Sequence, residues 1–110
     1  MDESVSSRRQ LEDYFLKFPH CAPACKVGVE LEKLGVRPPS GKALSYHGPG
    51  GIAQILAELA RQSSWQASGE NGNIFQLALN SMYVTLEPGG QLELSTSECE
   101  LISEAEVQIE

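Results

Sequence analysis

The sequence predicts an α+β fold in which helices cover one face of an antiparallel sheet and leave the other face open and polar. Apolar residues recur at helical spacing in 51–62 and 98–110, and the stretches between them alternate apolar and polar residues. Short turns separate the later strands, and turns of that length join antiparallel neighbours. The expected order is helix, strand, helix, several adjoining strands, and a last helix.

Length and charge restrict the class of protein. With 110 residues we expect a single domain or part of one, in which residues 1–24 form a first helix and a connector. The net charge of -7 argues against nucleic acid or an anionic membrane as a partner, and fits a cation-binding or an ordinary soluble protein. No apolar run is long enough to span a bilayer. The acidic, polar start of the chain does not resemble a secretory signal, and three cysteines do not form the usual disulfide framework of a secreted protein. We therefore expect the protein in the cytoplasm.

The connector contains a possible zinc cluster, formed by His20, Cys21 and Cys25. Structural zinc usually needs four ligands, with a second pair some way downstream. Only His47 and Cys99 remain, singly and far apart, so a loop with free thiols is the favoured interpretation.

Residues 26–36 form the first expected strand, and two carboxylates lie on its polar face. Glu30 and Glu32 are two residues apart, which places them about 7 Å from each other along a strand. Like charges at that distance repel unless something positive lies beside them. Gly28 on the same face leaves room for such a group.

A second pair of carboxylates lies on a predicted hairpin at 82–95. Val84 and Leu86 alternate with polar residues before the turn, as do Leu92 and Leu94 after it. Pro88 cannot donate to a ladder and is followed by two glycines, so the strand must break there. Glu87 and Glu93 flank the break on one polar face, where the alternatives are a solvated hairpin and a site for a hard cation.

The glycine-rich stretch 47–51 precedes the helix at 51–62. Such a loop can hold phosphate on free backbone N–H groups. No Gly-Lys-Ser/Thr follows and no clear strand leads in, so we expect a flexible loop with a helix start rather than a P-loop.

Two of these stretches resemble the plant-type glutamate–cysteine ligases. Residues 26–36 are similar to that family's first active-site strand, a Gly-x-Glu-x-Glu-Lys pattern. Residues 85–95 resemble its Leu-Glu-Pro-Gly-Gly-Gln-x-Glu-Leu-Ser signature, and the order and separation of the two agree with the family. The resemblance covers the chain from about Cys25 onward and implies the N-terminal part of a larger glutamine synthetase-like catalytic domain.

The resemblance also implies an activity, cofactors and site residues. The family uses Mg²⁺ and ATP to activate the γ-carboxyl of glutamate, which the amine of cysteine then attacks to give γ-glutamylcysteine in glutathione synthesis. It implies Glu30, Glu32, Glu87 and Glu93 as metal ligands, and Gln91 with the Gly89–Gly90 backbone as substrate-binding groups. The other ligands, the groups that hold ATP and the cysteine pocket are expected beyond Glu110, so the isolated chain is expected to be inactive.

Two alternatives remain open at this stage. One is a non-catalytic acidic module that keeps the strands as an interaction or structural domain. The other is a ligase with the same chemistry and a different amine substrate, since the cysteine site cannot be identified in these residues.

Overall fold

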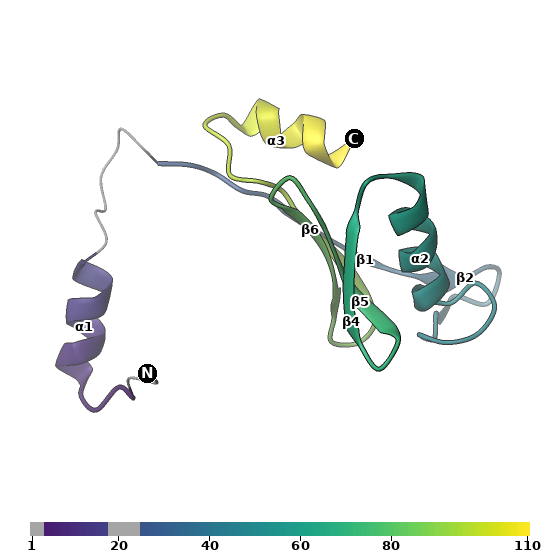
Figure 1. Ribbon diagram of the computed structural model, residues 1–110, viewed down its shortest axis with the longest axis horizontal. Helices are drawn as coiled ribbons and strands as arrows, with labels where there is room; N and C mark the ends of the chain where they lie inside the picture. The colour runs from purple at the N-terminus through teal and green to yellow at the C-terminus, as the bar shows by residue number, and fades with distance from the viewer. Residues whose placement is uncertain (1–3, 18–24) are drawn as a thin grey trace.

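Helix α2 (Ile52–Gln62) packs against one face of a five-stranded antiparallel sheet, and the apolar residues of the sheet gather on that face (Figure 1 shows the helix and the sheet). The structure is a computed structural model that describes residues 4–17 and 25–110. Its elements are α1 (Arg8–Leu16), β1 (Glu30–Leu34), β2 (Val36–Arg37), β3 (Lys42–Ala43), α2 (Ile52–Gln62), β4 (Gln66–Glu70), β5 (Asn73–Leu79), β6 (Met82–Glu87), β7 (Gln91–Ser95) and α3 (Ile102–Ile109). This is the predicted α+β class.

The main sheet has the strand order β1-β7-β6-β5-β4, and every neighbouring pair is antiparallel. Strands β2 and β3 form a separate two-stranded hairpin. Two-residue turns at 71–72 and 80–81 have positive φ at both residues, the backbone that matches the twist of a tight hairpin. These turns place β4, β5 and β6 side by side in chain order.

The β6–β7 turn is a type II turn. The N–H of Gly90 donates to the carbonyl of Glu87 at 3.1 Å, with Pro88 at the second position and Gly89 at the third. Gly89 has a φ of 83°, which glycine adopts without strain. The predicted hairpin over 82–95 is therefore confirmed, including the place where it breaks.

The core forms where α2 crosses the sheet. Ile52 and Leu56 of α2 and Leu77 of β5 are buried against one another. The hydroxyl of Tyr46 donates to the carbonyl of Ile74 at 2.6 Å and fastens the loop before α2 to β5. The partly buried hydrophobic side chains packed around this cluster are those of Leu44, Tyr46, Leu59, Ala60, Trp65, Ile74, Val84, Leu86 and Leu92.

Two expectations need correction, and one strand has no signal in the sequence. This strand, β4, extends to Glu70 and pairs with β5 through a bulge at Ser68/Gly69. All of β4 is exposed, so it lacks the alternation that marks a half-buried strand. The strand expected over 26–36 is divided into a bridge at Val27, β1 and β2, and the last helix begins at Ile102 rather than near 98. The bridge from Val27 to Cys99 explains the later start of the helix, since it holds the residues before α3 in extended backbone.

The helices differ in how they relate to the sheet. Helix α1 stands apart from the sheet and has no buried residue, whereas α2 contributes two residues to the core (Figure 1). No helix in residues 4–17 and 25–110 has the length and apolar character needed to cross a bilayer.

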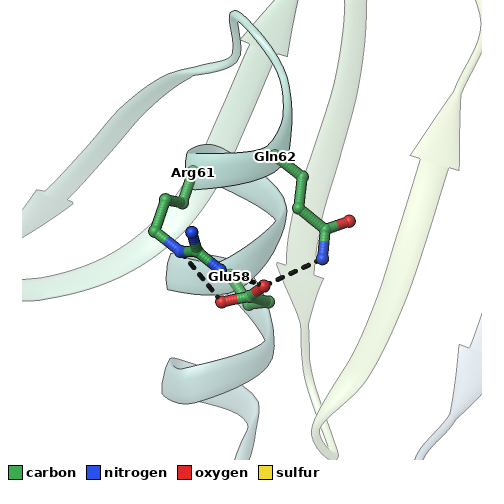
Figure 2. Close-up of polar contacts among 3 residues, drawn as sticks. All are labelled: Glu58, Arg61 and Gln62. Carbon is green, nitrogen blue, oxygen red and sulfur yellow. Dashed lines mark hydrogen bonds and ion pairs between the residues drawn. The ribbon is translucent and has the colours of Figure 1, made fainter.

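The solvent face of α2 carries a local ion pair (Figure 2). The guanidinium of Arg61 donates to Glu58 at 2.6 Å, and the side-chain amide of Gln62 donates to the same carboxylate at 2.9 Å. Arg61, and then Gln62, stabilise the charged form and hold the pKa of Glu58 below its usual value.

This network predicts how the Glu58 carboxyl titrates. We expect its midpoint, followed by NMR, to lie below that of an ordinary glutamate, and Arg61→Ala to raise the pKa toward the ordinary value. The depressed pKa contributes to stability above the unfolded pKa, and this contribution is lost as the pH falls through the folded pKa. A Glu58 midpoint that does not move in Arg61→Ala would contradict the assignment.

The core predicts a large effect at Leu77. Leu77→Ala is expected to reduce the free energy of unfolding by about 2–5 kcal/mol, because it removes a fully buried side chain and leaves a cavity. Urea denaturation would measure the change. Phe75→Ala, at an exposed position of the same strand, is the matched control and should cost clearly less.

Candidate functional site

The sheet register determines which side chains share the open face. Residues paired directly across antiparallel strands lie on the same face of a sheet. Glu32 of β1 is paired with Glu93 of β7, and Glu93 with Thr85 of β6. Two residues away along the strands, Glu30 of β1 is paired with Ser95 of β7. Two residues away in the other direction, Gln91 of β7 is paired with Glu87 of β6. The open face thus runs across β1, β7 and β6.

All four predicted carboxylates lie on this face. Glu30 and Glu32 are two residues apart on β1, as are Gln91 and Glu93 on β7, and Glu87 is opposite Gln91. The intervening Val84, Leu86 and Leu92 pack toward the core and α2. The carboxylates therefore lie on the face opposite α2, which we call the carboxylate face. By register it carries Leu34 and Tyr83 together with seven polar residues, which are Glu30, Glu32, Glu87, Glu93, Thr85, Gln91 and Ser95.

Glu32 and Glu93 are the closest backbone neighbours among the four acids. They occupy directly opposed positions on adjacent strands, where Cβ atoms are about 4.5–5.5 Å apart. Like charges in this arrangement destabilise a sheet. Among the residues that the structure describes, no Lys or Arg forms an ion pair with any of the four acids.

Two hydroxyl groups orient the acids nearest the turn. Thr85 Oγ1 donates to Glu87 Oε1 at 2.9 Å, and Ser95 Oγ donates to Glu93 Oε1 at 3.1 Å. Each hydroxyl lies two residues from its acid on the same strand and the same face. Sequence reasoning did not identify Thr85 and Ser95, although a hydroxyl residue two positions from an acid in a strand is a visible signal.

The acids differ in exposure and do not form a closed cage. Glu30 and Glu32 are exposed, whereas Glu87 and Glu93 are half-buried. Within the described parts of the chain, no group of three or more His, Cys, Asp or Glu side chains is arranged to hold a metal ion by itself. Any cation on this face would need further ligands from water or a bound molecule.

The β6–β7 turn places the expected substrate-binding groups at one end of the carboxylate face. Gln91 lies between Leu34 and Glu87 in the register and so belongs to that face. Gly89 is exposed, whereas Gly90 lies against the start of α2. A Cβ added at Gly90 would meet Ile52 Cδ1 at 3.3 Å, so a larger residue would press on the core.

The glycine-rich loop before α2 has no free N–H groups at the helix start. The N–H groups of Gly51, Ile52 and Ala53 donate to the carbonyls of Gly48, Ser45 and Tyr46 respectively, at 3.0–3.1 Å. A phosphate site at a helix N-terminus needs these donors to be available. The loop is thus a structural helix start, in agreement with the expectation that it is no P-loop.

The cysteine-rich connector lies mostly outside the described residues. His20 and Cys21 fall in that part of the chain, and Cys25 is an exposed free thiol. Cys99 is buried, where its thiol donates to the carbonyl of Ser97 and accepts from Gln108 Nε2.

Comparison with known proteins establishes the family. The family model for glutamate–cysteine ligase family 2 matches residues 26–110. The chain belongs to this family. It is 29% identical over 96 residues to the chloroplastic glutamate–cysteine ligase of Medicago truncatula, covering 87% of this chain and 18% of the relative. It is 32% identical over 77 residues to the enzyme of the same name from Nicotiana tabacum, covering 70% of this chain and 14% of the relative.

These relatives correct the expected location and show how much of a full-length ligase the chain covers. The expected cytoplasmic location is wrong, because the relatives from Medicago truncatula, Nicotiana tabacum and Arabidopsis thaliana are all named as chloroplastic enzymes. The chain spans 14–18% of the length of these relatives, and the matched part contains all four acids of the carboxylate face.

The loop geometry predicts the effect of a methyl group at Gly51. A Cβ there would lie 2.8 Å from the carbonyl oxygens of both Ser45 and Tyr46. Gly51→Ala is therefore expected to lower the free energy of unfolding by about 1–3 kcal/mol in urea denaturation, as overpacking does. Gly28→Ala is the control, since the nearest atoms there are at 3.9 Å. Equal stability of the two variants would contradict this account of the loop.

Proposed function

We propose that this chain supplies one part of the active site of an ATP-dependent ligase that joins the γ-carboxyl of glutamate to the amine of cysteine. The observation that carries the proposal is the gathering of Glu30, Glu32, Glu87 and Glu93 on one open face of the sheet. Membership of the glutamate–cysteine ligase family supports the reaction class. Because the chain spans 14–18% of its relatives, the activity is proposed for the whole protein.

The donor set of the carboxylate face fits Mg²⁺. This ion commonly binds through one or two carboxylates and completes its octahedral shell with waters and substrate phosphates. The opposed pair Glu32 and Glu93 supplies two such carboxylates without a complete protein cage. Bound Mg²⁺ would neutralise phosphate oxygens of ATP, which is the main requirement of phosphoryl transfer.

The other groups of this face have supporting roles in the proposal. The Thr85 and Ser95 hydroxyls hold the Glu87 and Glu93 carboxylates in fixed orientations and leave their other oxygens available. Gln91 and the Gly89–Gly90 backbone, at the turn end, would contact the substrate glutamate. Rigid strands hold such groups more accurately than loops do.

The absence of basic side chains from the described carboxylate face supports the proposal that the groups that bind ATP belong to other parts of the ligase. By register this face carries no Lys or Arg among the described residues. The cations that hold the outer phosphates would then come from residues that this chain does not contain. The lack of described Lys and Arg residues on this face also favours a second candidate function, that of an acidic module that binds cations without catalysis.

Cation titration tests the proposed metal ligands. The double variant Glu32→Gln/Glu93→Gln is expected to weaken Mn²⁺ affinity, measured by EPR, by about tenfold or more, since even an outer-shell change weakens metal sites that much. Without metal, the same variant should be more stable by about 0.2–1 kcal/mol, because it removes opposed like charges. Glu70→Gln, at the far edge of the sheet, is the control for lost negative charge.

The outcomes separate the candidates. Equal Mn²⁺ affinity of the double variant and the Glu70→Gln control would show that the carboxylate face is not a metal site, which would remove the basis of the proposal. Metal binding by the chain, combined with ligase activity of the whole protein that is lost in Glu93→Gln, would support the enzyme. Metal binding without an effect on that activity would favour the acidic module.

A further inference from the structure

A groove with apolar walls lies on the side of the sheet that α2 only partly covers. Its volume is about 380 Å³, and five elements contribute to it. Helix α2 contributes Leu59, and α3 contributes Ile109, so the groove lies between the two helices and the sheet. We call it the leucine groove; its apolar lining consists of Leu31, Leu59, Val84, Leu92, Leu94 and Ile109.

The chain exposes more surface than a compact protein of its size. Its accessible surface is 8736 Å², whereas a compact monomer of this mass exposes about 6,000 Å². Helix α1, which stands apart, accounts for some of the excess (Figure 1). The rest of the molecule contributes too, since Leu34 is 61% exposed and Ile102 is 68% exposed. The excess is total accessible surface, and it includes large apolar side chains of the kind that a partner covers.

We propose that the leucine groove is the docking surface for a segment of the ligase polypeptide that this chain does not contain. The relatives are several times longer than the matched region, which is 14–18% of their length, so the family supplies such segments. Every residue of the groove lies within the family match at 26–110, whereas α1 lies outside it.

Lys33 indicates the chemistry of that segment. It lines the groove together with the apolar side chains and Glu93, and its ammonium forms no ion pair with the described residues. A segment that fills the groove would bring a carboxylate to this cation, because an unpaired charge at a buried interface is costly. The structure therefore favours an apolar segment with one Asp or Glu beside its apolar residues.

A peptide array tests the proposal directly. Overlapping peptides that cover the Medicago truncatula relative outside the matched region would be probed with this protein, and the binders measured by fluorescence polarisation. We expect a small set of apolar, acid-bearing peptides to bind. Leu94→Asp and Lys33→Glu should each weaken binding by about tenfold or more, as changes at interface anchors do. Val107→Asp, at a position 74% exposed and outside the groove lining, should bind like the unchanged protein.

The following results of the binding experiments would contradict the docking proposal. It fails if no peptide binds, or if binding is the same in Lys33→Glu as in Val107→Asp. Lys33 is already exposed, so its substitution remains informative if Leu94→Asp does not fold, which circular dichroism would show. A dimer in analytical ultracentrifugation that Lys33→Glu dissociates would assign the groove to a second copy instead. Peptide binding and Mn²⁺ affinity are separate measurements on the unchanged protein, so the docking proposal can fail while the proposed metal site stands.

Discussion

The antiparallel register of β1, β7 and β6 is the constraint on which the remainder of the structure depends. Since side chains alternate along a strand, pairing Glu32 with Glu93 determines the face of every other residue in these strands. A slip of one residue would turn the acids toward α2 and the leucines toward solvent. The type II turn at Pro88–Gly89 helps to prevent that slip, because turn geometry and loop length set the register of a hairpin.

Packing of α2 gives the sheet its two different faces. Ile52 and Leu56 cover Leu77, and the loop carbonyls wrapped around Gly51 hold the first turn of this helix in place. These carbonyls accept hydrogen bonds from the N–H groups that a bound anion would need. The N–H groups therefore stabilise the start of the helix and are not available to bind phosphate.

Much of the sheet and of the candidate site could be predicted because both follow from local alternation. Glu30, Glu32, Glu87 and Glu93 are each next to apolar residues of a strand, so period two alone placed them on polar faces. That the two polar faces are one continuous face depends on which strands pair. Local alternation does not specify that β1 pairs with β7, because the chain between them contains α2 and three strands of the same sheet.

The features that could not be predicted depend on long-range pairing or on sorting signals. Strand β4 exists because β5 pairs with it, and its exposed residues show no pattern of their own. The leucine groove needs Leu59 and Ile109 to meet the sheet, which no local pattern specifies. The location of the relatives depends on recognition by cellular machinery and is independent of fold energetics.

The Val27–Cys99 bridge has a consequence for how this unit can be combined with other sequence. Two backbone hydrogen bonds of 2.8 Å join these residues, so the chain enters the sheet and leaves it at adjacent positions. Everything between them is a closed loop whose ends are held together. A unit of that kind can be transplanted between longer polypeptides, because the host chain needs only to bridge a short gap. Additions at either end then begin from the same corner, away from the turn end of the carboxylate face.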